Sequence, residues 1–188
     1  MNDKNFDHLL QPICKIAVQA GSIINKYYKI NKDVSFKEDK SPLTKADLES
    51  NKFIIQSLIE LDSTIPVLTE ESLVDWSVRK HWSQYWLVDP LDGTKEFINQ
   101  NDEFTVNIAL IENHNPVLGV IYAPALSTLY YAYKNKGSHK LFIEKNFDSI
   151  SGSIEIRTLN KKKTDHLRVF ESRSHSNVEF QKWVNENI

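Results

Sequence analysis

Residues 89–94 combine the residue types expected at a divalent-metal and phosphate site. The segment reads Asp-Pro-Leu-Asp-Gly-Thr and follows an apolar run at 85–88. We expect a strand to end at Asp89 and a tight turn to direct Asp89 and Asp92 at one point, with the carbonyl of Leu91 between them. Gly93 permits a positive φ or the close approach of a ligand. Two carboxylates and a carbonyl are hard oxygen donors, which suit Mg²⁺.

The residues that follow predict an anion site beside this metal site. Thr94 precedes a short helical pattern at 95–98 and is expected to cap it. A helix N-terminus presents free N–H groups and positive partial charge, which favours phosphate. A dication next to a phosphate predicts phosphoryl transfer, in which two metal ions stabilise the attacking and leaving oxygens. The structural alternative is that Asp92-Gly93 is a turn without chemistry.

Acidic residues at two other places favour the metal interpretation. Glu70 and Glu71 follow a short apolar strand predicted at 65–69, where adjacent acids contribute little to structure but make good ligands. Asp47 lies in the first turn of a predicted helix, where a carboxylate interacts favourably with the helix dipole. Each also has a structural explanation, as a solvated strand end or as a helix N-terminal charge.

Among the elements that must position these residues, helical patterns come first and extended patterns mostly later. Apolar residues at three- and four-residue steps predict helices at 6–28, from Thr44 onward and at 178–188, with a polar loop at 31–43. The second helix is expected to start near Thr44 or Ser41 and to bury Leu48, Phe53, Ile54, Leu58 and Ile59. Strands are predicted at 65–69, 85–88, 104–111, 117–122 and 128–133, with weaker ones at 140–144, 153–158 and 167–171. This order favours an α+β fold, a layered helix/sheet sandwich with a mainly antiparallel sheet.

Composition narrows the functional classes. The chain has 188 residues and a net charge of −2, so no basic field favours a nucleic-acid partner. No apolar run approaches the roughly 20 residues of a transmembrane helix, and the N-terminus lacks the pattern of a signal peptide. Cys14, the one cysteine, lies in an apolar helical pattern and is expected to be a buried hydrophobic residue. These features predict a cytoplasmic protein without an integral membrane segment.

Several stretches resemble the signature of the inositol monophosphatase superfamily. The central one is Trp86 to Phe97, and its companions are Ser41-Pro42-Leu43-Thr44-Lys45-Ala46-Asp47 and Val67-Leu68-Thr69-Glu70-Glu71. Within this superfamily, four stretches are similar to CysQ-type 3′(2′),5′-bisphosphate nucleotidases: 95–97, 103–110, 119–124 and Ser172-Arg173-Ser174-His175. The resemblance covers essentially the whole chain and is weakest at 134–166. It implies the N-terminal lobe of a sugar-phosphatase-like fold.

The resemblance implies metal ligands at four positions. Glu70, Asp89 and the Leu91 carbonyl would hold the first Mg²⁺, and Asp89 with Asp92 would hold part of a second. The family is expected to use two or more Mg²⁺ ions and to be inhibited by Li⁺.

The resemblance also implies catalytic and substrate-binding roles. Thr94, helped by Asp47, would orient and activate the attacking water, and the backbone N–H groups of Gly93 and Thr94 would bind the departing phosphate. The implied substrate-binding set is Glu70, Leu91, Asp92, Gly93 and Thr94. The implied reaction converts adenosine 3′,5′-bisphosphate to AMP and phosphate, so the expected partner is a small phosphorylated nucleotide. The resemblance accommodates a homodimer and a peripheral location on the cytoplasmic face of the inner membrane.

Family members continue into a second α/β lobe, which supplies an aspartate to the second metal site. No residue after 172–175 matches that lobe, so it is expected to be largely absent and the second metal site incomplete. We therefore predict an N-terminal metal-binding lobe at 1–171 and the start of a C-terminal lobe at 172–188. The chain is then a fragment or a shortened relative of weak or no activity. An inositol or sugar-phosphate monophosphatase and a non-catalytic metal-binding remnant stay open as alternatives.

Overall fold

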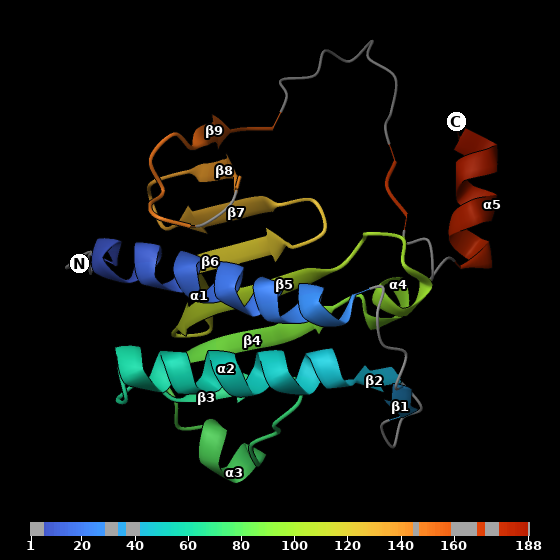
Figure 1. Ribbon diagram of the computed structural model, residues 1–188. Coiled ribbons are helices and arrows are strands. Elements are labelled where there is room, and N and C mark those ends of the chain that lie inside the picture. Colours follow the sequence, from blue (N-terminus) through green and yellow to red (C-terminus); the bar gives the residue numbers. More distant parts are fainter. Residues whose placement is uncertain are drawn as a thin grey trace. The chain divides into compact units, whose positions relative to one another are not determined.

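Figure 1 shows a computed structural model, which describes residues 6–28, 34–36, 42–144, 147–158, 169–171 and 177–187. The chain divides into two compact units, Met1–Ile156 and Arg157–Ile188, and each is described by itself. Within the described part of the chain, no helix is both long enough and apolar enough to span a membrane.

The first unit is built on a seven-stranded sheet whose spatial order follows the order of its strands in the sequence. The strands are β3 Val67–Thr69, β4 Gln84–Asp92, β5 Thr105–Glu112, β6 Asn115–Ala123, β7 Thr128–Tyr133, β8 Ser138–Phe142 and β9 Ile154–Ile156. β3 pairs with β4 in parallel, and every other neighbouring pair in this sheet is antiparallel. The predicted α+β fold with a mainly antiparallel sheet is therefore confirmed.

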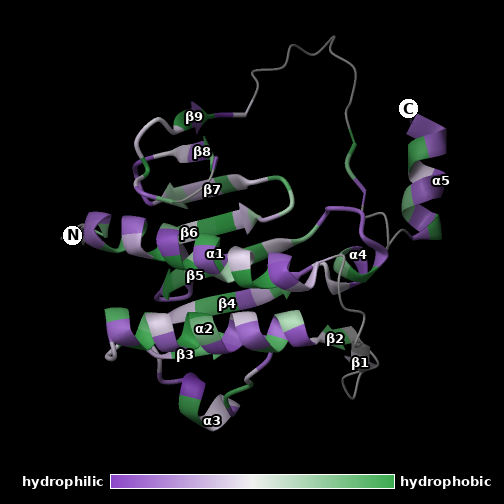
Figure 2. Ribbon diagram, viewed as in Figure 1, coloured by the Kyte–Doolittle hydropathy of each residue, from purple (hydrophilic) through white to green (hydrophobic). Residues whose placement is uncertain are grey.

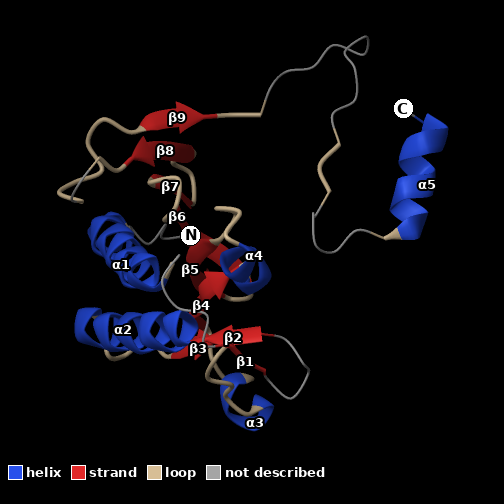
Figure 3. Ribbon diagram, turned by 45° about the vertical axis from the view of Figure 1, so that its right-hand side comes forward, coloured by secondary structure: helices blue, strands red, loops and turns tan. Residues whose placement is uncertain are grey.

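Two long helices, α1 Asp7–Tyr27 and α2 Lys45–Leu61, cover one face of this sheet (Figures 1 and 3). Both alternate between hydrophilic and hydrophobic residues (Figure 2), as expected of helices with one buried face. Gly21 brings α1 close to β6, because a Cβ there would lie 2.5 Å from the Tyr122 ring.

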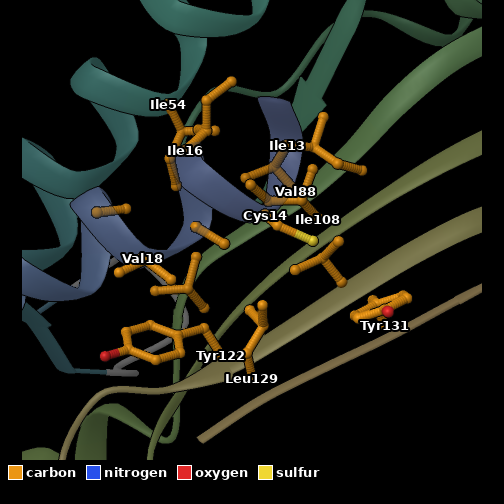
Figure 4. Close-up of a cluster of buried hydrophobic side chains, with 14 of the residues drawn as sticks. Ile13, Cys14, Ile16, Val18, Ile54, Val88, Ile108, Tyr122, Leu129 and Tyr131 are labelled. Atoms are coloured by element: carbon orange, nitrogen blue, oxygen red, sulfur yellow. The ribbon is translucent and has the colours of Figure 1, made fainter. Parts of the chain in front are cut away.

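The core lies between these helices and the sheet. Figure 4 shows side chains from α1, α2 and the central strands meeting there, among them Ile13, Ile54, Val88 and Ile108. Cys14 is fully buried in this cluster, and burial raises the pKa of its thiol to about 12. Its predicted role as a buried hydrophobic residue is confirmed.

Five smaller elements complete the described structure. They are a two-stranded sheet of β1 Val34–Phe36 and β2 Pro42–Thr44, and the helices α3 Trp76–Arg79, α4 Thr94–Asn99 and α5 Val178–Asn187. The second unit contains α5.

Some predicted boundaries are wrong. The segment 31–43 is not simply a loop, because β1 and β2 pair across it. Leu48 and Ile59 are half exposed rather than on the inner face of α2, since Ala46, Ser50 and Ile54 occupy that face. The strand predicted at 167–171 is absent from its described residues, 169–171. The predicted lobe boundary at residues 171 and 172 stays a prediction.

Candidate active site

The first part of the site is the N-terminus of α2. Thr44 caps the helix, and the backbone N–H of Thr44 donates to Asp47 Oδ2 over 2.8 Å. The Thr44 hydroxyl donates to the same oxygen, and the Asp47 N–H donates back to Thr44 Oγ1 over 3.4 Å. This reciprocal arrangement is a capping box, which fixes the Asp47 side chain at the start of the helix.

Asp47 Oδ1 faces the other way and contacts α4. Thr94 Oγ1 lies 3.2 Å from Asp47 Oδ1 and 3.3 Å from the Leu91 carbonyl, so its hydroxyl is within hydrogen-bonding distance of both oxygens. Asp47 is only 1% exposed, and this burial raises the pKa of its carboxyl against the opposing effect of the bonds from Thr44 and Thr94. A buried carboxylate beside a hydroxyl is suited to accepting its proton.

Asp89 and Asp92 lie on a strand that continues past the point where we expected a turn. β4 runs to Asp92, and its pairing with β5 shifts register between Asp89 and Asp92. Pro90 has no N–H to offer the ladder, so a local irregularity replaces the predicted tight turn. Ser50 Oγ donates to the Pro90 carbonyl over 2.9 Å in the buried interface with α2, which anchors this irregular segment.

The predicted cap of α4 is also wrong. Gly93, not Thr94, is the N-cap, and its φ of +89° is the conformation that its lack of a side chain permits. A Cβ at this position would lie 2.8 Å from the backbone oxygen of Glu103. Thr94 is therefore the first helical residue, and its hydroxyl is directed to Asp47 and Leu91 instead of to the helix backbone.

The parallel pairing of β3 with β4 places Glu70 beside Asp89. Thr69 is the register partner of Val88, and the Glu70 N–H donates to the Val88 carbonyl over 3.2 Å. The pKa of Asp89 is raised to about 7, first by burial and then by the negative charges of Glu70 and Asp92. The Leu91 N–H, 3.2 Å from Asp89 Oδ1, opposes this effect.

The predicted residues thus form two connected groups. Hydrogen bonds join Asp47, Thr94 and the Leu91 carbonyl, whereas electrostatic interactions join Glu70, Asp89 and Asp92. Among the described residues, no group of three or more His, Cys, Asp or Glu side chains is arranged so that it could hold a metal ion. The carboxylates are neighbours of Asp89 without forming a closed coordination shell. The segment 172–175, whose side chains completed the sequence resemblance, lies outside the described residues.

A cavity of about 670 Å³ opens on the face of the sheet opposite α1 and α2. Its polar lining includes Glu70, Asp89, Asn107, Arg79 and Thr69, and Leu87 and Ile121 are among its apolar lining residues. The acidic group is therefore accessible from this face.

Comparison with known proteins identifies the family. The model of the inositol monophosphatase family matches residues 5–185. The chain belongs to the inositol monophosphatase family.

Its relatives in this family include bacterial nucleotidases. The 3′(2′),5′-bisphosphate nucleotidase CysQ of Escherichia coli K12 is 41% identical over 180 residues, which are 95% of this chain and 69% of that protein. The CysQ nucleotidase of Salmonella typhimurium is 52% identical over 130 residues, 68% of this chain and 53% of that protein. The crystal structure of CysQ from Bacteroides thetaiotaomicron is similar with a TM-score of 0.78 at 36% identity, over 96% of this chain and 68% of that one. These three matches span between 53% and 69% of the relatives' length.

The chemical type of these donors, rather than their arrangement, fits the metal that the inositol monophosphatase family implies. Three carboxylates and one backbone carbonyl are hard oxygen ligands, which Mg²⁺ prefers to nitrogen or sulfur. The mutual repulsion that contributes to the raised pKa of Asp89 is the kind of interaction that a dication relieves.

Two residues of this site were not predicted from the sequence. Asn107 Nδ2 donates to Asp92 Oδ2 over 3.1 Å, and Ser50 holds the Pro90 carbonyl. Asn107 had a detectable signal, because it is an amide between Val106 and Ile108 in an otherwise apolar strand. Ser50 had none, since a serine on a helix has many ordinary explanations.

Proposed function

We propose that this chain carries the metal- and phosphate-binding site of a magnesium-dependent phosphomonoesterase that hydrolyses adenosine 3′,5′-bisphosphate to AMP and phosphate. The observation that carries the proposal is the hydrogen-bonded connection from Asp47 through the Thr94 hydroxyl to the Leu91 carbonyl, next to the carboxyl of Asp89. Similarity to CysQ nucleotidases over 95% of the chain supports the substrate class.

The metal would be held by four residues. Glu70, Asp89 and the Leu91 carbonyl are the proposed ligands of a first Mg²⁺, and Asp89 with Asp92 are proposed ligands of a second. Bound Mg²⁺ supplies electrostatic stabilisation of the phosphoryl group and a water of lowered pKa. Because the Leu91 carbonyl also lies 3.3 Å from Thr94 Oγ1, this carbonyl would connect the metal-binding group to the catalytic pair.

The chain's own residues would then position and deprotonate the water. Thr94 Oγ1 donates its proton to Asp47 Oδ1 and thereby presents its lone pairs to a water on the accessible side. As the water attacks, its proton passes to Thr94, and the Thr94 proton passes to Asp47. Phosphoryl transfer needs positioning and charge stabilisation more than a strong base, so this weak relay suffices.

Phosphate release from this chain tests the proposal. Adenosine 3′,5′-bisphosphate and inositol 1-phosphate should be compared at equal concentration with Mg²⁺, with and without added Li⁺. We expect faster release from the nucleotide and inhibition by Li⁺. Faster turnover of inositol 1-phosphate would instead support a sugar-phosphate monophosphatase.

A non-catalytic metal-binding role is the second candidate, because the matched region covers only part of the relatives' length. This role predicts Mg²⁺ binding by calorimetry without hydrolysis of either substrate. Measurable turnover by the 188-residue chain would exclude it.

A further inference from the structure

Asp92 lies where β4 has left its regular pairing with β5. Asp89 on β4 pairs with Asn107 on β5, and Asp92 pairs with Thr105. Three positions along β4 therefore match only two positions along β5. The extra residue on β4 displaces the Asp92 side chain from the regular alternation of the sheet, and Asp92 is exposed. The orientation of an exposed carboxylate on an irregular strand end depends on the side chains that contact it.

A pair of hydrogen bonds from β5 supplies this orientation. Thr105 Oγ1 donates to Asn107 Oδ1 over 3.0 Å, and Asn107 Nδ2 donates to Asp92 Oδ2 over 3.1 Å. The carboxylate accepts only from the nitrogen end of the amide, and the Thr105 hydroxyl occupies the oxygen end. Thr105 therefore fixes which way the amide points, and the amide fixes one oxygen of Asp92.

The same amide is next to the other carboxylate of the site. Asn107 is the register partner of Asp89 and lines the 670 Å³ cavity together with Asp89 and Glu70. An uncharged donor here holds Asp92 without adding a fourth negative charge to the group. Residues that orient metal ligands in this way commonly change metal affinity or activity by about 10- to 100-fold when they are replaced.

We propose that Asn107, itself oriented by Thr105, is a positioning residue that holds the Asp92 carboxylate for metal binding. This inference rests on the proposed function, since it takes Asp92 as a ligand of Mg²⁺. Asn107 Nδ2 donates to Asp92 Oδ2, which would leave Oδ1 of Asp92 available to a bound metal ion.

Mg²⁺ titration of the full 188-residue chain by calorimetry tests the inference. The Asn107→Leu variant keeps the size of the side chain but removes the donor, and we expect about tenfold or greater loss of Mg²⁺ affinity. Thr105→Val should lose less, because the amide remains but is free to rotate. The double variant should bind like Asn107→Leu alone, since Thr105 acts through Asn107.

The matched control is Asn115→Leu. Asn115 is an exposed asparagine at the start of β6 whose amide donates to the Asn113 carbonyl over 2.8 Å, at the other end of the β5–β6 pair. This variant should bind Mg²⁺ like the parent chain. Thermal unfolding of every variant shows whether a loss of Mg²⁺ affinity comes from a misoriented Asp92 or from an unfolded chain. If Asn107→Leu does not fold, the Mg²⁺ affinity of Thr105→Val tests the positioning role.

Equal Mg²⁺ affinity of Asn107→Leu and Asn115→Leu would overturn the positioning role and leave the proposed function intact. Additive losses in the double variant would show that Thr105 and Asn107 act separately. This result would overturn the proposal that Thr105 orients Asn107. Absence of Mg²⁺ binding by the parent chain would overturn both the inference and the proposed function.

Discussion

At the scale of single residues, Thr94 links the two halves of the candidate site. Its hydroxyl contacts the buried carboxylate of Asp47 and the carbonyl of Leu91. Gly93 and not Thr94 forms the N-cap of α4, so the Thr94 hydroxyl does not cap the helix backbone. The chemistry proposed for this site therefore depends on one hydroxyl group.

Replacing Thr94 by valine removes this hydroxyl at nearly constant volume. We expect phosphate release to fall by about 100-fold or more, because general-base assistance is worth that much. The thermal midpoint should change little, since Thr94 is only half-buried. Thr94→Ser keeps the hydroxyl and is the control, which should retain most of the activity; equal loss in both variants would contradict the role of the hydroxyl.

The pH dependence of stability follows from Asp89. Its pKa is raised from 3.8 to about 7, so the folded state favours the protonated carboxyl. This contribution stabilises the protein fully below pH 3.8 and is lost as the pH rises through about 7. In EDTA, the thermal midpoint of the parent should therefore fall more between pH 6 and pH 8 than that of Asp89→Asn.

Added Mg²⁺ should oppose this loss at pH 8, because a dication stabilises the ionised carboxylates. Identical pH profiles for the parent and Asp89→Asn would show that Asp89 does not titrate in this range. Asp47, whose pKa is also raised by burial, contributes in the same direction in both proteins and so cancels from the comparison.

At the scale of elements, α4 and the segment after it are held in place by contacts from outside the helix. Tyr28, at the end of α1, donates its hydroxyl to Asp102 Oδ1 over 2.7 Å and accepts from the Asp102 N–H over 2.9 Å. Its ring packs against Phe97 and Phe104, with centroid distances of 5.4 and 4.7 Å. These contacts hold α4 and the segment after it against α1, which keeps Thr94 near Asp47.

Tyr28→Phe separates the hydroxyl from the ring. The aromatic contacts remain, while Asp102 loses both of its bonds to the phenol. We expect a loss of about 1–2 kcal/mol in the free energy of unfolding, the usual range for such bonds. Urea denaturation measures it, and Tyr130→Phe, at a half-buried position of β7, should show a smaller loss.

Gly93→Ala tests the other constraint on α4. The position combines a φ of +89° with a Cβ that would lie 2.8 Å from the Glu103 oxygen, so we expect a destabilisation of about 2 kcal/mol or more. Gly152→Ala is the matched control, because Gly152 has a φ of +80° but no atom within 4 Å of the place that a Cβ would take. The difference between the two variants in urea denaturation isolates the clash from the backbone strain.

Local patterns predicted most of these elements but not their irregularities. The periodicity around Ile13 and Ile54 predicted α1 and α2, and the apolar runs around Val106 and Val120 predicted β5 and β6. The strand was predicted to end at Asp89, with Pro90 in the turn that follows, because nothing local indicates that a register shift accommodates a proline within β4. Leu48 and Ile59 have helical spacing, but smaller residues such as Ala46 occupy the buried face of α2, which leaves Leu48 and Ile59 turned outward.

The site itself was predictable in its residues more than in its geometry. The motif resemblance named Asp47 and Thr94, whose contact joins positions that are 47 residues apart in the chain. Convergence of Glu70 with Asp89 depends on the parallel pairing of β3 with β4, which is a long-range property that periodicity does not encode. Asn107 was missed for a similar reason, since its hydrogen bond to Asp92 depends on the register shift between Asp89 and Asp92.

At the scale of the molecule, the face of the sheet opposite α1 and α2 carries an apolar patch beside the acidic group. Leu68, Leu87, Ala109 and Gly119 are successive register partners across four strands. Leu87 and Ile121 are 43% and 47% exposed on this face. A contiguous apolar surface of this kind favours association.

We therefore expect self-association of the 188-residue chain that rises with concentration. Ile121→Lys should weaken it by about tenfold or more, because burying an isoleucine side chain contributes roughly 1.5–3 kcal/mol. Analytical ultracentrifugation measures the dissociation constant. Leu126→Lys, at a 59% exposed position in the β6–β7 turn, is the control and should leave it unchanged.

The two oxygens of the Asp47 carboxylate have separate duties, and this division limits how an inactive form of the protein can be made. Oδ2 fastens the beginning of α2, whereas Oδ1 receives the Thr94 hydroxyl. Substituting Asp47 would abolish turnover and also destabilise the start of α2. Such a variant is therefore poorly suited to capturing a bound nucleotide. Thr94→Val leaves the helix fastening untouched, and it is the better choice for trapping an uncleaved ligand in a crystal.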